Sequence, residues 1–186
     1  MTTPKQLIDR LREDFGCSLK DERMLFMINA LEARLAKEVL RKTDILKTSI
    51  KKDESRITLD FPAQQILRLS FKGKELRKNG LNEPFGYKCE GNDIVFDFAH
   101  SSGEVALEYL VIPKPFSQSD YAQRQLLLED SFCEIYIYHI LSREALLCDD
   151  IERLNNYSTI YAAALRELIS SCGSSFSGAN KFVNIW

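Results

Sequence analysis

Glycine, proline and histidine are scarce in this sequence of 186 residues, which contains 8 Gly, 5 Pro and 2 His. So little glycine and proline excludes the collagen-like and low-complexity classes. With 45% hydrophobic and 28% charged residues, the composition is that of a folded globular protein. A chain of this length can bury about two thirds of the surface that it exposes when unfolded. We therefore expect one ordered domain around a single core.

Long apolar runs are also missing. No window approaches the roughly 18 apolar residues of a membrane span, and the first residues, MTTPKQLIDRLREDF, lack the basic start and apolar run of a signal peptide. The charge is nearly balanced, with 25 Lys and Arg against 27 Asp and Glu, so no strong positive field exists to attract nucleic acid. We expect a protein that stays where it is made and binds neither membranes nor specific nucleic-acid sequences.

The residue types that carry most enzyme chemistry form no recognisable pattern. The five cysteines are scattered without a CxxC pair, which argues against a disulfide framework or a zinc ribbon. Cys133 and His139 share a predicted helix, but six residues place them about 120° apart around its axis and about 9 Å apart along it. They cannot pair as nucleophile and base. His100 lies beside a predicted turn, and neither histidine belongs to a metal-ligand motif. We expect no catalytic residue, no metal, no cofactor and no small-molecule substrate.

Two helices are predicted at the start of the chain. Thr3 can cap free amides, Pro4 suits the first helical position, and Gly16 ends the helix. A second apolar stripe at helical spacing predicts a longer helix from about Asp21 to Arg41. The short connection between the two helices predicts a helical hairpin.

Strand periodicity replaces helical periodicity in the middle of the chain. The alternating apolar residues predict strands over 45–50, 57–61, 66–71, 87–89, 94–98 and 105–112. The turn-forming residues 52–55 are expected to join the first two strands as a hairpin, and residues 90–93 are a second turn signal. We therefore expect an antiparallel β-meander.

Helical periodicity returns from about Asp120. The four bulky residues Ile135–Tyr138 surround this helix with apolar groups, so we expect it to be the most buried one. A last helix starts at Asp149 and Asp150, where acidic residues suit the helix dipole, and stops at Gly173. The predicted fold class is α+β, with an N-terminal helical hairpin, a central antiparallel β-meander and a C-terminal pair of helices in one domain over residues 1–173.

Residues 174–186 are rich in Gly and Ser and finish in the apolar sequence FVNIW. The composition predicts a flexible tail. Because Phe and Trp are effective interface anchors, the candidate partner-binding residues are Phe182, Val183, Ile185 and Trp186. Folding back onto the chain's own core is an equal alternative, since burying these side chains is favourable in either place.

Four segments between residues 4 and 172 carry a resemblance to a known family. They are the opening helix PKQLIDRLREDF, the pair Ile28–Asn29 followed by Leu31–Glu32, the segment ITLDFPAQQILRLSFKGKEL and the helix DIERLNNYSTIYAAALREL. In this order they resemble the head-to-tail connector proteins, also called adaptor or neck proteins, of tailed bacteriophages and prophages.

The resemblance implies a structural virion assembly protein that is not an enzyme. Such a protein forms a ring, commonly twelvefold, below the portal, extends the DNA channel and provides the docking surface for the tail. Its partners would be other copies of itself, the portal and tail proteins. Its location would be the virion, or the bacterial cytoplasm when a prophage expresses it. The alternative is a non-enzymatic bacterial protein-binding module of α+β fold, which would be a monomer with an exposed apolar patch.

Overall fold

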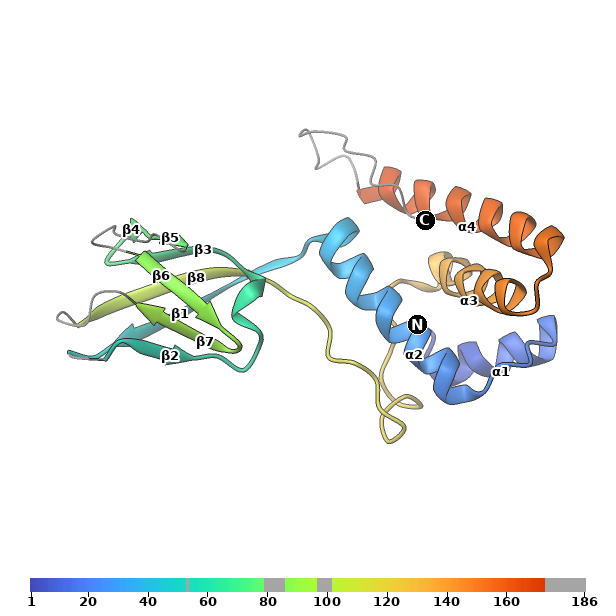
Figure 1. The fold of residues 1–186 in the computed structure, drawn as a ribbon, viewed down its shortest axis with the longest axis horizontal. Coiled ribbons are helices and arrows are strands. Elements are labelled where there is room, and N and C mark those ends of the chain that lie inside the picture. Colours follow the sequence, from blue (N-terminus) through green and yellow to red (C-terminus); the bar gives the residue numbers. More distant parts are fainter. Residues whose placement is uncertain (53, 79–85, 97–101, 173–186) are drawn as a thin grey trace. The chain divides into compact units, whose positions relative to one another are not determined.

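The computed structural model describes residues 1–52, 54–78, 86–96 and 102–172 (Figure 1). The fold class is α+β, as predicted, with two helices near the start, antiparallel sheets in the middle and two helices at the end. The chain divides into two compact units. A helical unit contains residues 1–40 and the chain from Ile112 onward, and a β unit contains residues 41–111.

The helical unit begins with α1 (Pro4–Phe15) and α2 (Asp21–Leu35). Thr3 caps α1 as predicted, because its hydroxyl accepts a hydrogen bond from the Gln6 amide at 3.3 Å while the Gln6 side chain accepts one from the Thr3 amide at 2.9 Å. Gly16 ends α1 in the left-handed conformation, with φ of 63°. After α2 the helix continues as one wider π turn over Ala36–Leu40. The predicted second helix therefore has nearly the expected extent, but its last turn is not α-helical.

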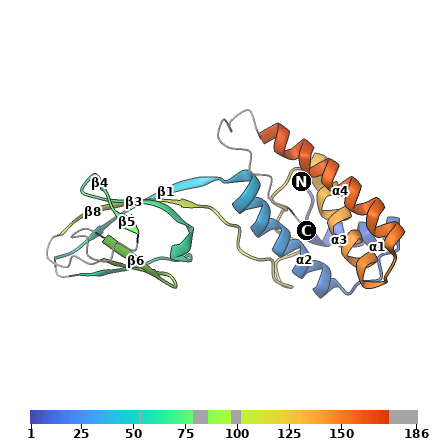
Figure 2. The same ribbon diagram turned by 45° about the horizontal axis from the view of Figure 1, so that its top comes forward.

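The other two helices, α3 (Cys133–Leu147) and α4 (Ile151–Cys172), lie side by side (Figures 1 and 2). The carboxylate of Asp150 accepts a hydrogen bond from the Arg153 amide at 3.0 Å, so the predicted start of the last helix is confirmed. Burial is more extensive along α3 than along the other described helices, as expected from its four bulky residues. The helix expected from about Asp120, however, starts only at Cys133, after one 3-10 turn over Asp130–Phe132.

The described residues of the β unit form two four-stranded sheets. Its strands are β1 (Thr43–Ile50), β2 (Arg56–Thr58), β3 (Ile66–Phe71), β4 (Lys74–Glu75), β5 (Arg77–Lys78), β6 (Gly86–Glu90), β7 (Asp93–Phe96) and β8 (Gly103–Leu110). The strand orders are β1-β8-β3-β4 and β2-β7-β6-β5, and the described pairs are antiparallel except β5 with β6. The strands therefore do not follow one another as they would in a simple meander.

The turn predicted at residues 90–93 does connect two paired strands, β6 and β7. The hairpin predicted across residues 52–55 is wrong, because β1 pairs with β8 and β2 pairs with β7 in the other sheet. The residues of β1 and β2 pair with residues 35 to 67 positions away in sequence. Alternation of apolar residues identifies a strand but carries no information about its neighbour.

The β unit has a core of its own between the two sheets. It contains Ile50, Leu69 and Leu107 from one sheet and Ile94 and Phe96 from the other. A separate cluster of buried residues joins the helices of the helical unit. The expectation of a single core is therefore wrong, because the apolar faces of the sheets cover each other and need no helix. No described helix is both long and apolar enough to span a bilayer.

Candidate functional site

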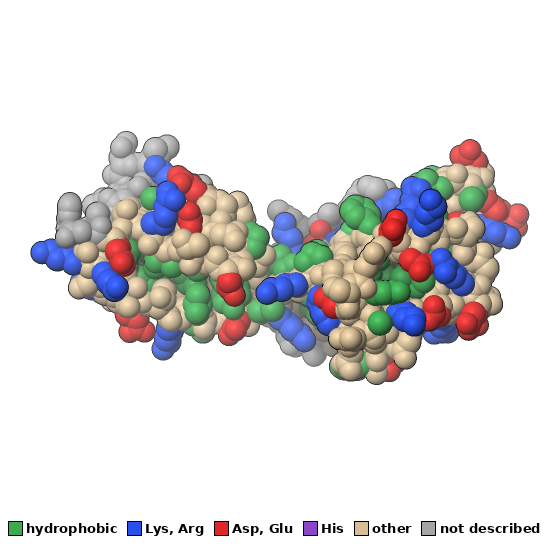
Figure 3. All heavy atoms as spheres, turned by 90° about the horizontal axis from the view of Figure 1, so that it is seen from below, with side chains coloured by type: hydrophobic (Ala, Val, Ile, Leu, Met, Phe, Trp, Pro, Cys, Tyr) green, Lys and Arg blue, Asp and Glu red, His purple; other side chains and the backbone are tan. Residues whose placement is uncertain are grey.

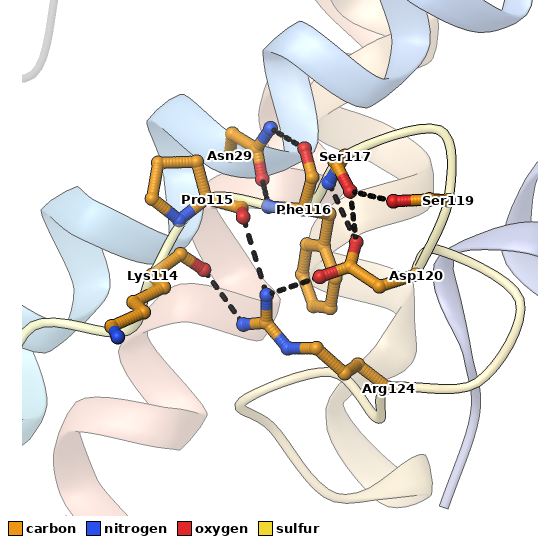
Figure 4. A network of polar contacts seen from close by, with 8 residues as sticks. All are labelled: Asn29, Lys114, Pro115, Phe116, Ser117, Ser119, Asp120 and Arg124. Carbon is orange, nitrogen blue, oxygen red and sulfur yellow. Dashed lines mark hydrogen bonds and ion pairs between the residues drawn. The ribbon is translucent and has the colours of Figure 1, made fainter.

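The most extensive group of polar contacts fastens the irregular segment 112–129 to α2 (Figure 4). The side chain of Asn29 on α2 donates a hydrogen bond from Nδ2 to the Phe116 carbonyl at 2.9 Å and accepts one at Oδ1 from the Phe116 amide at 2.7 Å. One amide side chain therefore satisfies both backbone groups of a residue whose exposed fraction is 4%.

Arg124 holds the same segment from its other side. Its guanidinium donates hydrogen bonds to the carbonyl of Lys114 at 2.7 Å and to that of Pro115 at 3.2 Å, and it forms an ion pair with Asp120 at 3.0 Å. It also lies 4.4 Å from the centre of the Phe116 ring. The bond from Arg124, followed by that from the Ser117 amide, lowers the pKa of the Asp120 carboxyl. The guanidinium of Arg124 thus connects residues 114 and 115, at the start of the segment, to residues 120 and 124 further along it.

Glu32, one turn after Asn29, is a buried carboxylate with an exposed fraction of 3%. Its Oε1 accepts hydrogen bonds from the Leu127 amide at 2.6 Å and from the Tyr136 hydroxyl at 3.0 Å. Burial raises the pKa of Glu32, and these two hydrogen bonds counteract part of that rise. The pKa of Tyr136 is also raised, chiefly by burial and then by the neighbouring Glu32. Glu32 therefore connects α2, the irregular segment and α3 in one network.

We call Asn29, Glu32, Asp120 and Arg124 the polar clamp. Each member makes its contacts to backbone groups or to neighbouring side chains of the helical unit, so the clamp fixes a long irregular segment in place. These side chains already have hydrogen-bond partners within the helical unit, which suits a structural role. Within the ranges that the structure describes, no group of three or more His, Cys, Asp and Glu residues could hold a metal ion.

The two residues weighed for chemistry are placed separately. The Cys133 thiol is buried and lies 3.9 Å from the Glu129 carbonyl. The His139 ring packs on Tyr161, with 5.4 Å between ring centres. Burial, followed by the charges of two nearby arginines, lowers the pKa of His139 to about 4, so the ring is neutral at pH 7. Cys133 and His139 thus have different neighbours, in agreement with their spacing along the helix.

The predicted partner-binding residues fall outside the described part of the chain. These are Phe182, Val183, Ile185 and Trp186, and His100 is likewise outside it. What the structure adds is an exposed apolar corner between α3 and α4, formed by Leu146, Leu147 and Ile151 with exposed fractions of 49%, 49% and 68%. Elsewhere, Lys and Arg side chains are interspersed with Asp and Glu over the faces of both units drawn in Figure 3.

The polar clamp was not predicted from the sequence, although one local signal for it exists. Ser117 and Asp120 stand in an S-x-x-D pattern, in which the acidic side chain commonly bonds the backbone of the first residue. Here Asp120 accepts hydrogen bonds from the Ser117 amide at 2.6 Å and from its hydroxyl at 3.0 Å. A scan of protein-family models and a search of curated proteins each found no match to this chain.

Proposed function

We propose that the chain is a head-to-tail connector, or adaptor, protein of a tailed bacteriophage or prophage, a structural virion protein that forms a ring below the portal. The proposal extends the resemblance described above. One observation carries it: the central motif of that resemblance, Ile28–Asn29 followed by Leu31–Glu32, supplies two members of the polar clamp.

Every residue of this motif has a separate task in the helical unit. Ile28 and Leu31 are buried in its core, with exposed fractions of 0% and 2%. Asn29 binds both backbone groups of Phe116, and Glu32 binds the Leu127 amide and Tyr136. A generic amphipathic helix needs only the apolar pair. The amide and the acid at these spacings therefore tie the motif to this particular arrangement of helices, which favours a family likeness over coincidence of composition.

Exposed apolar side chains support a role in assembly. A ring needs two different complementary surfaces on each subunit, because its contacts are heterologous. The corner of Leu146, Leu147 and Ile151 places three large aliphatic side chains in water within one turn of chain. Clusters of this kind are costly unless a partner covers them. We assign this corner to the contact with a neighbouring subunit or with the portal.

The same corner also fits the alternative function, a bacterial protein-binding module that acts as a monomer. The two functions differ in stoichiometry, because a module binds one partner through its apolar patch whereas a connector assembles copies of itself around a portal ring.

Light scattering on the purified full chain, over a range of concentrations and with the portal ring of the same virus or prophage added, distinguishes them. A connector gives a multi-subunit mass alone, or joins the portal in a fixed ratio of many copies per ring. A 21.4 kDa monomer that does not bind the portal ring would contradict the proposal.

A further inference from the structure

The four edges of the two sheets in the β unit are not protected equally. The edge strands β4 and β5 have two residues each and consist of charged side chains, Lys74–Glu75 and Arg77–Lys78. The edge strand β2 has three residues, and its Arg56 forms ion pairs with Asp93 at 3.0 Å and Glu90 at 3.4 Å. Short length and charge are the usual devices that prevent an edge from pairing with another chain.

The fourth edge, β1, is protected less, because it is the longest of the four and only Asp44 and Lys47 among its eight residues are charged. It is eight residues long, pairs with β8 without a bulge from Thr43 to Ile50, and contains no proline. Almost all of its residues are exposed, and two large apolar side chains, Ile45 and Leu46, have exposed fractions of 62% and 37%. Among the described residues, β8 is the one strand that pairs with β1, so the other side of β1 can accept an added strand.

The hydrogen bonds show which backbone groups face outward. The Lys42 carbonyl accepts a hydrogen bond from the Val111 amide on the β8 side, whereas the Ile45 amide donates at 2.8 Å to its neighbour Asp44 instead of to β8. In an antiparallel pair, alternate residues direct both backbone groups to the same neighbour. The even-numbered residues of β1 therefore bind β8, and the odd-numbered ones, from Thr43 to Ser49, direct their amides and carbonyls to the open edge.

The exposed apolar side chains specify what kind of strand would pair there. Ile45 and Leu46 are consecutive, so they lie on opposite faces of the sheet. A strand added beside β1 meets one exposed apolar side chain on each face, and it gains most if it is itself apolar on both faces. A strand of alternating apolar and charged residues would cover only one of the two.

One segment of this chain has that composition. In Lys181–Trp186, Phe182 and Trp186 fall on one side of an extended strand, and Val183 and Ile185 fall on the other. Phe, Val, Ile and Trp all favour strands, and the five residues from Phe182 carry no charge. At about 3.3 Å per residue, these six residues span about 20 Å, within the roughly 26 Å of β1. The segment lies outside the described residues, so it is considered through its sequence alone.

We propose that the segment Lys181–Trp186 of one copy adds as a strand to the open edge of β1 in a neighbouring copy. The inference rests on the proposed ring function, and it gives that ring a heterologous contact: each subunit offers one edge and one strand. For the strand to bind, the Asp44 carboxylate must release the Ile45 amide. A backbone carbonyl of the incoming strand then accepts the hydrogen bond of that amide.

Two full-length variants test this pairing separately. Lys47→Pro removes an outward amide of β1 without removing a hydrogen bond to β8, and it blocks the approach of a strand. If that variant unfolds at a lower temperature than the wild type, Ile45→Lys serves instead, since an edge lysine opposes pairing without a backbone change. The tail variant carries both Asn184→Pro and Ile185→Pro. Because consecutive backbone amides of a strand point to opposite sides, this variant loses one amide on each side of the segment. Light scattering gives the mass of each variant, of the wild type and of an equimolar mixture of the edge and tail variants.

The expected result is that the wild type assembles, that each variant alone associates at least tenfold more weakly, and that the mixture forms a complex of two chains. Two chains are the limit because only one intact edge and one intact segment remain. If both variants assemble like the wild type, the proposed strand pairing is overturned, whereas the proposed ring function is not. If the tail variant still pairs while the edge variant does not, the occupant of β1 is another β1, which also overturns it. A monomeric wild type overturns the inference together with the self-assembly of the proposed ring.

Discussion

Asn29→Ala is the substitution that tests the polar clamp most cleanly. It deletes both hydrogen bonds to Phe116 while leaving the apolar stripe of α2 unchanged. The amide and carbonyl of Phe116 then lose their partner in a place where water has little access, because 4% of this residue is exposed.

The magnitude follows from two opposing effects. Two hydrogen bonds contribute about 1 kcal/mol each, and more if the backbone groups left behind find no water. Alanine gains about 0.5 kcal/mol over asparagine within a helix. We therefore expect the helical unit to lose about 2 kcal/mol of its free energy of unfolding.

Urea unfolding followed by circular dichroism at 222 nm is the appropriate assay, since the helical unit dominates that signal. Asn156→Ala on α4 is the matched control, because Asn156 is exposed and lies inside a helix. The control should gain about 0.5 kcal/mol through helix propensity alone. If Asn29→Ala is as stable as this control, the clamp does not hold the segment and the reasoning behind it fails.

Three further predictions concern the helical unit. Arg124→Lys, which loses the fork to two carbonyls, should speed proteolytic cleavage within residues 114–124 by about tenfold or more under native conditions, and an unchanged rate would contradict the role of the guanidinium. Because burial lowers the pKa of His139 to about 4, the unfolded chain takes up a proton below about pH 6.5 that the folded chain does not. The free energy of unfolding should therefore fall between about pH 6.5 and pH 4, by as much as about 3 kcal/mol, and His139→Phe should remove this dependence in urea titrations. Thiol labelling followed by mass spectrometry should modify exposed Cys148 rapidly, whereas Cys17, buried and with its pKa raised to about 11, should react only on unfolding.

The local features of the fold were predictable because neighbouring residues determine them. Thr3 with Gln6 forms the capping box of α1, Gly16 adopts the left-handed conformation that ends it, and Asp150 caps α4. Each depends on contacts within about four positions. The turn between β6 and β7 belongs to the same class.

Long-range pairing was not predictable in the same way. The partner of β1 is β8, more than 50 residues later, and periodicity of 2 is identical whether a strand pairs with the next one or a distant one. The late start of α3 has a similar cause. A helix was expected from about Asp120, but Asn29 and Glu32 on α2 bind the Phe116 and Leu127 amides, so side chains 87 and 95 residues away stabilise an irregular path.

The separate core of the β unit could not be inferred from composition, because apolar strands are equally compatible with a sheet covered by helices and with two sheets packed together. For the candidate site, the motif Ile28–Asn29 with Leu31–Glu32 was recognised from the sequence. Its contacts to the irregular segment depend on the tertiary fold, and they emerged only with the structure.

The mass of the purified full chain in solution tests the central proposal most directly. Light scattering across a hundredfold range of concentration should give a multi-subunit assembly, about twelve times the 21.4 kDa of one chain if the ring is twelvefold. A mass of one chain at every concentration, with no incorporation when the portal ring is added, would contradict the assignment as a connector.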